Sequence, residues 1–327
     1  MTTALSVVVP TYGCAACLGE LYRRLVEVLT TTVPTFEIIF VCDGSPDECW
    51  SVVQELAAKD TRVVGVEFSR NFGQHTAILA GTDYARGETM VVMDCDLQHD
   101  PASIPRMLET LRQGYDVVMT RRVNRKDALW KRLTSRVFVA ARNWLSGVDL
   151  DPGISNFSIV DRKVIVALRS MRERSRSYAY FLAWLGFKTA IIDVDHHERF
   201  AGESSYSMFR LIRHASESIV AASDLPLRLS IRAGLFMSGF AALWAVWLII
   251  RYFWIATPPE GWTSVMVALF FLSGLVLFNM GVVGLYVGRI FEESKRRPLY
   301  VVRDSINAES NAAAAGARAS TDVTTKG

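Results

Sequence analysis

Two long stretches near the carboxyl end of this 327-residue chain contain no charged residue, and they limit its fold more than any other feature. Residues 233–250 and 263–288 are dominated by apolar side chains. Each is long enough to cross ~30 Å of hydrocarbon as a helix that rises ~1.5 Å per residue. A helix inside a soluble protein rarely runs this long without a polar face. We therefore expect two membrane-spanning helices; the alternative is a buried hairpin of a soluble protein.

The overall composition excludes two other classes of protein. The chain has 36 Lys and Arg against 33 Asp and Glu, a net charge of +3, and half of its residues are hydrophobic. It is too apolar for a disordered protein and too weakly basic for a dedicated nucleic-acid binder, so no nucleic-acid partner is expected.

The basic residues around the two stretches predict their orientation. Those residues are Arg228 and Arg232 before the first stretch, and Arg289, Lys295, Arg296 and Arg297 after the second. The connector, residues 256–262, has neither Lys nor Arg. By the positive-inside rule, both termini and residues 1–230 face the cytosol of the inner (plasma) membrane. The first residues lack the features of a signal peptide, and the five cysteines form no disulfide spacing pattern, which fits a reducing compartment.

Apolar strand-like and helix-like segments alternate through the first 125 residues. Strands are predicted over 6–9, 37–42, 63–68, 89–94 and 116–120, and helices over 18–29, 49–59, 76–86 and 104–113. The alternation predicts an α/β fold, a mostly parallel sheet with helices on both faces. Ligands of such sheets bind beyond the carboxyl ends of the strands, so the polar residues there are candidate site residues.

Two basic amphipathic segments, 127–147 and 207–222, follow this region; each is either an interfacial helix at the membrane or an ordinary packed helix. The predicted organisation is a sheet domain over 1–206, juxtamembrane amphipathic helices over 207–230, a two-helix transmembrane hairpin over 231–291, and a cytosolic segment with a disordered tail over 292–327.

The segment Asp94-Cys95-Asp96-Leu97-Gln98 follows the apolar strand 89–94. Two carboxylates at i and i+2, with an amide oxygen two residues further on, are ligands that Mg²⁺ or Mn²⁺ prefers when substrate phosphates complete the site. A solvated acidic turn is the alternative.

Polar motifs also end the other predicted strands. They are Val9-Pro10-Thr11-Tyr12, Asp43-Gly44-Ser45, and Ser69-Arg70-Asn71-Phe72-Gly73-Gln74. An Asp at such a position can accept hydrogen bonds from a base or a ribose, and a glycine allows close backbone approach. Each motif alone is typical of a turn; four at the ends of one sheet indicate a site.

These four motifs, in this order, resemble the family 2 glycosyltransferases of GT-A fold. The resemblance continues in Arg199-Phe-Ala-Gly-Glu-Ser204-Ser-Tyr206, which is similar to the R-x-x-G-x-S-K-Y segment of polyisoprenyl-phosphate glycosyltransferases, and it covers about residues 5–303. The chain departs from the family pattern at Gly13-Cys14-Ala15, Cys42, Ser205 and Ser155–Ser158.

The resemblance implies transfer of a sugar, with inversion, from a nucleotide-diphosphate sugar to a polyisoprenyl phosphate, assisted by Mg²⁺ or Mn²⁺. It assigns Asp96 and Gln98 to the metal, Asp94 to the metal or the ribose, and Asp151 to orienting the acceptor. The expected donor contacts are Pro10, Thr11, Tyr12, Asp43, Ser69, Asn71, Gly73, Gln74 and Asp94, and the expected contacts with the lipid phosphate are Arg121, Lys131, Ser135, Arg199 and Ser204. The other expected partners are a lipid bilayer and three further copies of the chain in a homotetramer.

Other interpretations remain open. Cys14-Ala-Ala-Cys17 suggests a redox or zinc site, and His196-His197 a metal site, although each is a single short motif. A processive polysaccharide synthase would carry a Q-x-x-R-W motif, which this sequence lacks. A non-enzymatic alternative is a degenerate glycosyltransferase-like membrane scaffold.

Overall fold

The computed structural model describes residues 3–122, 153–173, 177–194, 225–254 and 261–308. They belong to two compact units. One unit contains the described residues up to Val194 together with those from Pro298 onward, and the other contains the described residues from Leu225 to Arg297.

The first unit is built on a single sheet. Its strands are β1 (Leu5–Thr11), β2 (Phe36–Cys42), β3 (Val63–Phe68), β4 (Thr89–Val92), β5 (Val117–Arg122), β6 (Ile154–Asp161), β7 (Thr189–Val194) and β8 (Val302–Ile306). Their spatial order is β7-β5-β6-β4-β1-β2-β3-β8. β6 is antiparallel to β4 and β5, and β8 is antiparallel to β3, while the remaining neighbours are parallel. The predicted mostly parallel α/β sheet is confirmed.

The central strands are buried on both faces. Every residue of β1 and β2 is buried. Side chains along a strand alternate between its faces, so Leu5, Val7 and Val9 pack into one hydrophobic cluster and Val8 into the other. This double burial explains why these strands appear in the sequence as continuous apolar runs rather than alternating ones.

Helices cover both faces of the sheet. The helices of this unit are α1 (Ala15–Thr32), α2 (Cys49–Lys59), α3 (Gln74–Tyr84), α4 (Ile104–Arg112), α6 (Arg162–Ser170) and α7 (Tyr178–Leu185), with a short 3-10 helix η1 (Pro101–Ser103) before α4. Apolar side chains of α1, α2 and α4 pack into one cluster, and those of α3, α6 and α7 into the other. Residues 76–84 of α3 are all buried, so this helix is covered nearly all round.

The strand β8 returns to the sheet from a distant part of the sequence. It pairs antiparallel with β3, with Glu67 opposite Asp304. Asn307 fixes its far end, because the side-chain amide donates hydrogen bonds to the carbonyls of Ala57 (3.1 Å) and Val63 (3.0 Å). No strand was predicted in the segment that follows the second apolar stretch.

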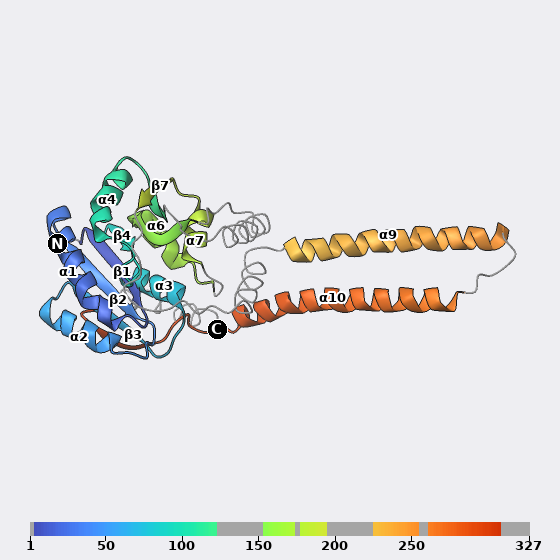
Figure 1. Ribbon diagram of the computed structural model, residues 1–327, viewed down its shortest axis with the longest axis horizontal. Helices are drawn as coiled ribbons and strands as arrows, with labels where there is room; N and C mark the ends of the chain where they lie inside the picture. The colour runs from blue at the N-terminus through green and yellow to red at the C-terminus, as the bar shows by residue number, and fades with distance from the viewer. Residues whose placement is uncertain (1–2, 123–152, 174–176, 195–224, 255–260, 309–327) are drawn as a thin grey trace, which may run out of the picture. The chain divides into compact units, whose positions relative to one another are not determined.

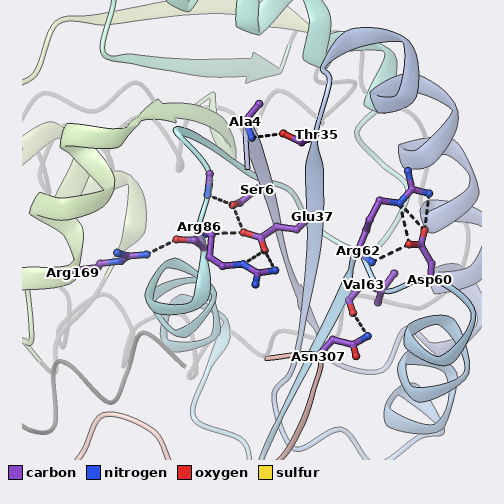
Figure 2. Close-up of polar contacts among 12 residues, drawn as sticks. Ala4, Ser6, Thr35, Glu37, Asp60, Arg62, Val63, Arg86, Arg169 and Asn307 are labelled. Atoms are coloured by element: carbon purple, nitrogen blue, oxygen red, sulfur yellow. Dashed lines mark hydrogen bonds and ion pairs between the residues drawn. The ribbon is translucent and has the colours of Figure 1, made fainter. Parts of the chain in front are cut away.

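A polar network closes the amino-terminal edge of the parallel strands. Glu37 is 2% exposed, and its Oε1 accepts hydrogen bonds from the Ser6 hydroxyl (2.6 Å) and the backbone N–H of Arg86 (2.6 Å). Its Oε2 accepts from Nε of Arg86 (2.8 Å), and Figure 2 shows Glu37 between these two residues. The backbone N–H of Gly87 donates to the same Ser6 hydroxyl (2.8 Å). Since ligands bind at the other edge, this network ties β1, β2 and the chain before β4 together without entering the site.

The second unit contains two long helices, α9 (Leu225–Trp254, 30 residues) and α10 (Trp262–Ser294, 33 residues), which lie side by side (Figure 1). Large apolar side chains point outward from both, among them Phe236 (76% exposed) and Phe278 (65%). Within the described residues, one stretch, Phe271–Ser294 of α10, is long and apolar enough to cross a membrane, and an 18-residue window of it has a mean hydropathy of 1.8. The arrangement with two spans stays a prediction.

Candidate functional site

The carboxyl ends of β1, β2, β3 and β4 meet at one edge of the sheet. The register places Thr11 of β1 level with Cys42 of β2, and Cys42 level with Glu67 of β3. The backbone N–H of Asp43 then donates to the Thr11 carbonyl (3.0 Å). The structure therefore brings together the polar segments that follow these strands, 11–15, 43–47, 69–74 and 94–98, through the contacts described next.

The Asp43 carboxylate holds the loop that follows β3. It is 2% exposed, and its two oxygens accept hydrogen bonds from the backbone N–H groups of Phe72 (2.6 Å) and Gly73 (2.8 Å). Burial raises the pKa of Asp43, while these two donors favour its charged form. Gly44 has a φ of +57°, and a Cβ there would lie 2.3 Å from the carbonyl carbon of Arg70, so the position accepts only glycine. Asp43 and Gly44 thus shape the predicted donor-binding loop, and direct contact of Asp43 with the donor stays a prediction.

A hydrogen bond joins this loop to the acidic segment. Gly73, at a φ of +97°, is the residue before α3, and Gln74 is the first residue of that helix. Nε2 of Gln74 donates to Oδ1 of Asp94 at 2.6 Å. Gln74 was predicted as a donor contact; its position shows a second possible role, orienting Asp94.

The acidic segment keeps its oxygen ligands half-buried at the edge of the sheet. Asp94, Asp96 and Gln98 are each of intermediate exposure. Leu97 between them has a φ of +59°, which is uncommon for a side chain with a Cβ, and the backbone N–H of Gln98 donates to Oδ1 of Asp96 (3.2 Å). This turn keeps the two carboxylates and the amide within one short loop.

The donor set of this loop suits a hard divalent cation. Mg²⁺ is usually held by one or two carboxylates plus substrate phosphates, rather than by a cage made entirely of protein groups. Within the described residues, no group of three or more His, Cys, Asp or Glu is arranged to hold a metal ion by itself. The residues present fit a cation that is shared with a diphosphate.

The residues at the end of β1 differ sharply in exposure. Pro10 is buried, and Thr11 is 1% exposed. The Thr11 hydroxyl lies 3.2 Å from both the Val41 carbonyl and the Cys42 sulfur. Tyr12 is 53% exposed. Of the three predicted donor contacts here, Tyr12 is the side chain that the structure presents to solvent.

The loop after β2 supports the loop after β1. The hydroxyl of Ser45 accepts a hydrogen bond from the backbone N–H of Gly13 (2.8 Å), and Oδ2 of Asp47 accepts one from the N–H of Ala15 (2.9 Å). Asp47 therefore satisfies a free N–H at the start of α1, where the preceding residue Cys14 makes no capping bond of its own. Asp47 was not predicted as a site residue, because it lies 32 residues from Ala15 in the sequence.

The remaining donor candidates lie on the exposed side of the loop after β3. Ser69 and Asn71 are both exposed. The backbone N–H of Ser69 donates to the carbonyl of Val301 (3.0 Å), next to β8. The guanidinium of Arg70 stacks over the ring of Phe72 at 4.2 Å from its centroid.

Arg121, predicted to contact the lipid phosphate, lies on β5 opposite Asp193 of β7. Nε and Nη2 of Arg121 donate to the two carboxylate oxygens of Asp193 at 2.7 and 3.2 Å. Both side chains are about half exposed, at 45% and 49%. Hydrogen bonding from Arg121 lowers the pKa of Asp193. The carboxylate fixes the orientation of the guanidinium, which sequence spacing did not indicate.

Five predicted site residues lie outside the described residues. They are Asp151, Lys131, Ser135, Arg199 and Ser204. His196 and His197 lie outside them as well. Their assignments stay predictions.

Comparison with known proteins gives consistent results along nearly the whole chain. Residues 6–165 match the family model described as glycosyl transferase family 2. The chain is 36% identical over 305 residues to the glycosyltransferase YkcC of Bacillus subtilis, covering 93% of this chain and 94% of the relative. It is 33% identical over 301 residues to the bactoprenol glucosyl transferase of Shigella phage SfV, covering 92% and 98%.

Among solved structures, one similar chain is glucosyl-3-phosphoglycerate synthase from Mycobacterium tuberculosis in complex with phosphoglyceric acid. The TM-score is 0.48 at 18% identity, over 67% of this chain and 80% of that one. The family model and the two relatives above 30% identity agree with the motifs gathered at the carboxyl edge of the sheet. This chain belongs to glycosyl transferase family 2.

Proposed function

We propose that the protein transfers a sugar from a nucleotide-diphosphate sugar, with a UDP-sugar favoured, to a polyisoprenyl phosphate such as undecaprenyl phosphate. The product is a lipid-linked monosaccharide made at the cytosolic face of the membrane for modification of a cell-envelope glycan, lipid A or O-antigen. One observation carries the proposal: Asp94 and Asp96 follow the buried strand β4 at the carboxyl edge of the sheet. It is supported by the 33% identity of the chain to a bactoprenol glucosyl transferase.

The reaction needs positioning more than acid–base chemistry. An oxygen of the acceptor phosphate attacks the anomeric carbon while the bond from that carbon to the nucleotide diphosphate breaks, which inverts the configuration. A phosphate is largely ionised at neutral pH, so it needs no strong general base. The protein's task is to align the two substrates and exclude water. Asp151 is our candidate for orienting the acceptor.

The donor would lie across the loops at the carboxyl edge. The exposed ring of Tyr12 offers a surface for the base, and the loop 69–74, held by Asp43, faces the same edge. Asp96 and Gln98, with Asp94, would hold Mg²⁺ or Mn²⁺ beside the diphosphate. When bound, such a cation would stabilise the negative charge of the leaving diphosphate. Gln74 keeps Asp94 in place for this.

The acceptor side would use arginine. Arg121 is held by Asp193, and a guanidinium with a fixed orientation can bind two oxygens of one phosphate. Lys131, Ser135, Arg199 and Ser204 are the other candidates. The apolar segment Phe271–Ser294 of α10 supports attachment to the bilayer that contains the acceptor's polyprenyl chain.

The test is a search for the lipid product. Full-length protein in mild detergent is incubated with undecaprenyl phosphate and a mixture of UDP-, GDP- and dTDP-sugars in Mg²⁺ or Mn²⁺, and the lipid fraction is analysed by mass spectrometry. We expect one lipid-linked monosaccharide. Asp96→Asn should lower the rate by about two to three orders of magnitude, because a charge that supports the leaving group is lost.

The exposed Asp304 of β8 offers a matched control, because Asp304→Asn removes the same charge far from the acidic segment and should leave the rate unchanged. Absence of product from every donor, with an intact fold, would favour the scaffold interpretation instead.

A further inference from the structure

The five cysteines of the chain gather on one side of the sheet. Cys14, Cys17, Cys42 and Cys49 are buried in the cluster beneath α1, α2 and α4, and Cys95 packs against it. In the sequence, the spacing Cys14-Ala-Ala-Cys17 suggests Cys17 as the neighbour of Cys14 in a redox or zinc site. In the structure, the sulfur of Cys14 lies 3.9 Å from that of Cys49, 35 residues away.

The two thiols of this pair have different surroundings. Cys49 is the first residue of α2, and its sulfur faces the backbone N–H of Cys14 at 3.4 Å. A hydrogen bond from the Cys14 thiol lowers the pKa of Cys49 despite burial, whereas hydrogen bonding to Cys49 and Cys95 raises the pKa of Cys14. Donors of this kind at a helix N-terminus favour the thiolate, which is the reactive form of cysteine. The Cys49 thiolate is thus suited to attack an oxidant first. The sulfur of Cys14 is suited to attack the oxidised sulfur of Cys49 afterwards.

Access to the pair limits what can react with it. Cys49 is 0% exposed, and Cys14 is 8% exposed beside the exposed Gly13. The exposed area of the pair belongs to Cys14, so a protein thiol or a bulky disulfide would not reach Cys49, whereas hydrogen peroxide, close to water in size, would enter from the Cys14 side.

We propose that Cys14 and Cys49 form a peroxide-sensitive disulfide at the donor edge of the sheet. The Cys49 thiolate attacks one oxygen of hydrogen peroxide, the O–O bond breaks, and Cys49 becomes a sulfenic acid while the other oxygen leaves as hydroxide and is protonated to water. The sulfur of Cys14 then attacks that of Cys49, the S–O bond breaks, and the proton of Cys14 leaves with the hydroxyl as a second water. Two thiols and one peroxide give one disulfide and two waters.

The disulfide would act on the loop that carries Tyr12. Bond formation brings the two sulfur atoms from 3.9 Å to about 2.05 Å. Cys14 lies two residues after Tyr12, and Gly13 and Ala15 are hydrogen-bonded to the loop after β2 through Ser45 and Asp47. Resting on the proposed function, we expect oxidation to shift this loop and weaken donor binding.

The first experiment measures the bond without using activity. Reduced full-length protein is treated with hydrogen peroxide, and peptide mapping by mass spectrometry should show loss of two hydrogens and a Cys14–Cys49 cross-link. Cys14→Ser and Cys49→Ser should each abolish the cross-link, and Cys17→Ser should retain it. A cross-link of Cys14 to Cys17 or Cys95 instead, or none, would overturn the proposal.

A second experiment measures UDP binding by calorimetry before and after oxidation. A loop displaced by an ångström or more should weaken binding by about tenfold, reversibly with dithiothreitol, and Cys49→Ser should be insensitive to peroxide. If the cross-link forms and UDP binding is unchanged, the inferred effect on the site is wrong. If neither oxidation state binds UDP, the proposed donor class fails while the disulfide stands.

Discussion

The two faces of the sheet are held together in different ways. On the thiol face, defined by α1, α2 and α4, the buried cluster consists largely of apolar side chains, and it includes Cys14, Cys17, Cys42 and Cys49. On the ion-pair face, defined by α3, α6 and α7, a carboxylate is built into the packing. Asp83 of α3 is 7% exposed, and its oxygens accept hydrogen bonds from both Nη atoms of Arg172 and, at 2.8 Å, from the hydroxyl of Tyr300.

The two faces differ because their helices differ in how much of their surface is exposed to solvent. Helices α1 and α4 keep one face in solvent, so their polar residues point outward. Helix α3 is covered along its length, so its polar groups need partners within the protein. Arg169 supplies two of them by donating to the carbonyls of Thr82 and Ala85. The thiol face therefore depends on buried apolar area, and the ion-pair face on specific contacts.

The largest effect on stability is expected on the thiol face. Leu21 of α1 is 0% exposed in its core, and Leu21→Ala removes buried methyl groups and leaves a cavity. We expect a loss of about 3 kcal/mol, measured as the shift in the urea midpoint of full-length protein in detergent. Arg23→Ala, on the exposed side of the same helix, is the control and should change the midpoint little. A small effect of Leu21→Ala would mean that this face is loosely packed.

On the ion-pair face, Arg172→Met should cost about 2 kcal/mol, because it leaves the buried Asp83 with fewer donors. The guanidinium of Arg172 is partly exposed, which keeps the cost below that of a fully buried pair. The same urea assay applies, and the double mutant with Tyr300→Phe separates the contributions. Since both partners bind Asp83, the two changes should be non-additive by more than about 0.5 kcal/mol. Strict additivity would show that the three residues do not act together.

The ion-pair face also contributes Gln74, the first residue of α3, to the candidate site, and its role can be tested kinetically. Gln74→Ala removes the hydrogen bond to Asp94, and we expect kcat to fall about tenfold, equal to about 1.4 kcal/mol, with little change in the KM for the donor. A fall in kcat at constant KM is expected if Gln74 acts by positioning Asp94. If the KM for the donor rises and kcat is unchanged, Gln74 contacts the donor directly instead.

Features that depend on a short stretch of the chain could be predicted from the sequence. Helix α2 was predicted with its observed bounds, 49–59, and its buried residues Cys49, Val53 and Ala57 recur every four residues, which is a helical period. The acidic segment 94–98 was predicted because a buried strand precedes it. In both cases the evidence lies within a short stretch of chain.

The contacts of the ion-pair face could not be predicted in that way. Tyr300 is separated from Asp83 by 217 residues, which include both apolar stretches, and it stacks on Phe68 of β3 with ring centroids 5.0 Å apart. Nothing local marks Val302–Ile306 as an edge strand, since three of its five residues are polar. The pairing of Cys14 with Cys49 was hidden because the nearer Cys17 suggested a different partner. Long-range partners of polar and sulfur groups depend on the assembled sheet.

The smallest effect concerns an ion pair on the thiol face. Asp60, which follows α2, accepts hydrogen bonds from Nε and Nη2 of Arg62, from the backbone N–H of Arg62 and from the hydroxyl of Tyr22, and Figure 2 shows its contacts with Arg62. Hydrogen bonding from Arg62 lowers the pKa of Asp60 to about 2, from an ordinary 3.8. Since Arg62 is 42% exposed and screened by solvent, Asp60→Asn should cost only about 1 kcal/mol at pH 7.

The direction of the pH dependence tests whether the charge of Asp60 is responsible for its contribution to stability. A carboxylate whose pKa is lower in the folded protein stabilises it fully above the ordinary value of 3.8, and that stabilisation is lost as the pH falls toward about 2. The difference in urea midpoint between the native protein and Asp60→Asn should therefore be constant from pH 7 to about 5 and should shrink below about 4. Added salt should reduce it at pH 7. A difference that persists unchanged at low pH would show that Asp60 acts through hydrogen bonds alone, and the thiol face would then contain no charge-dependent contribution at this position.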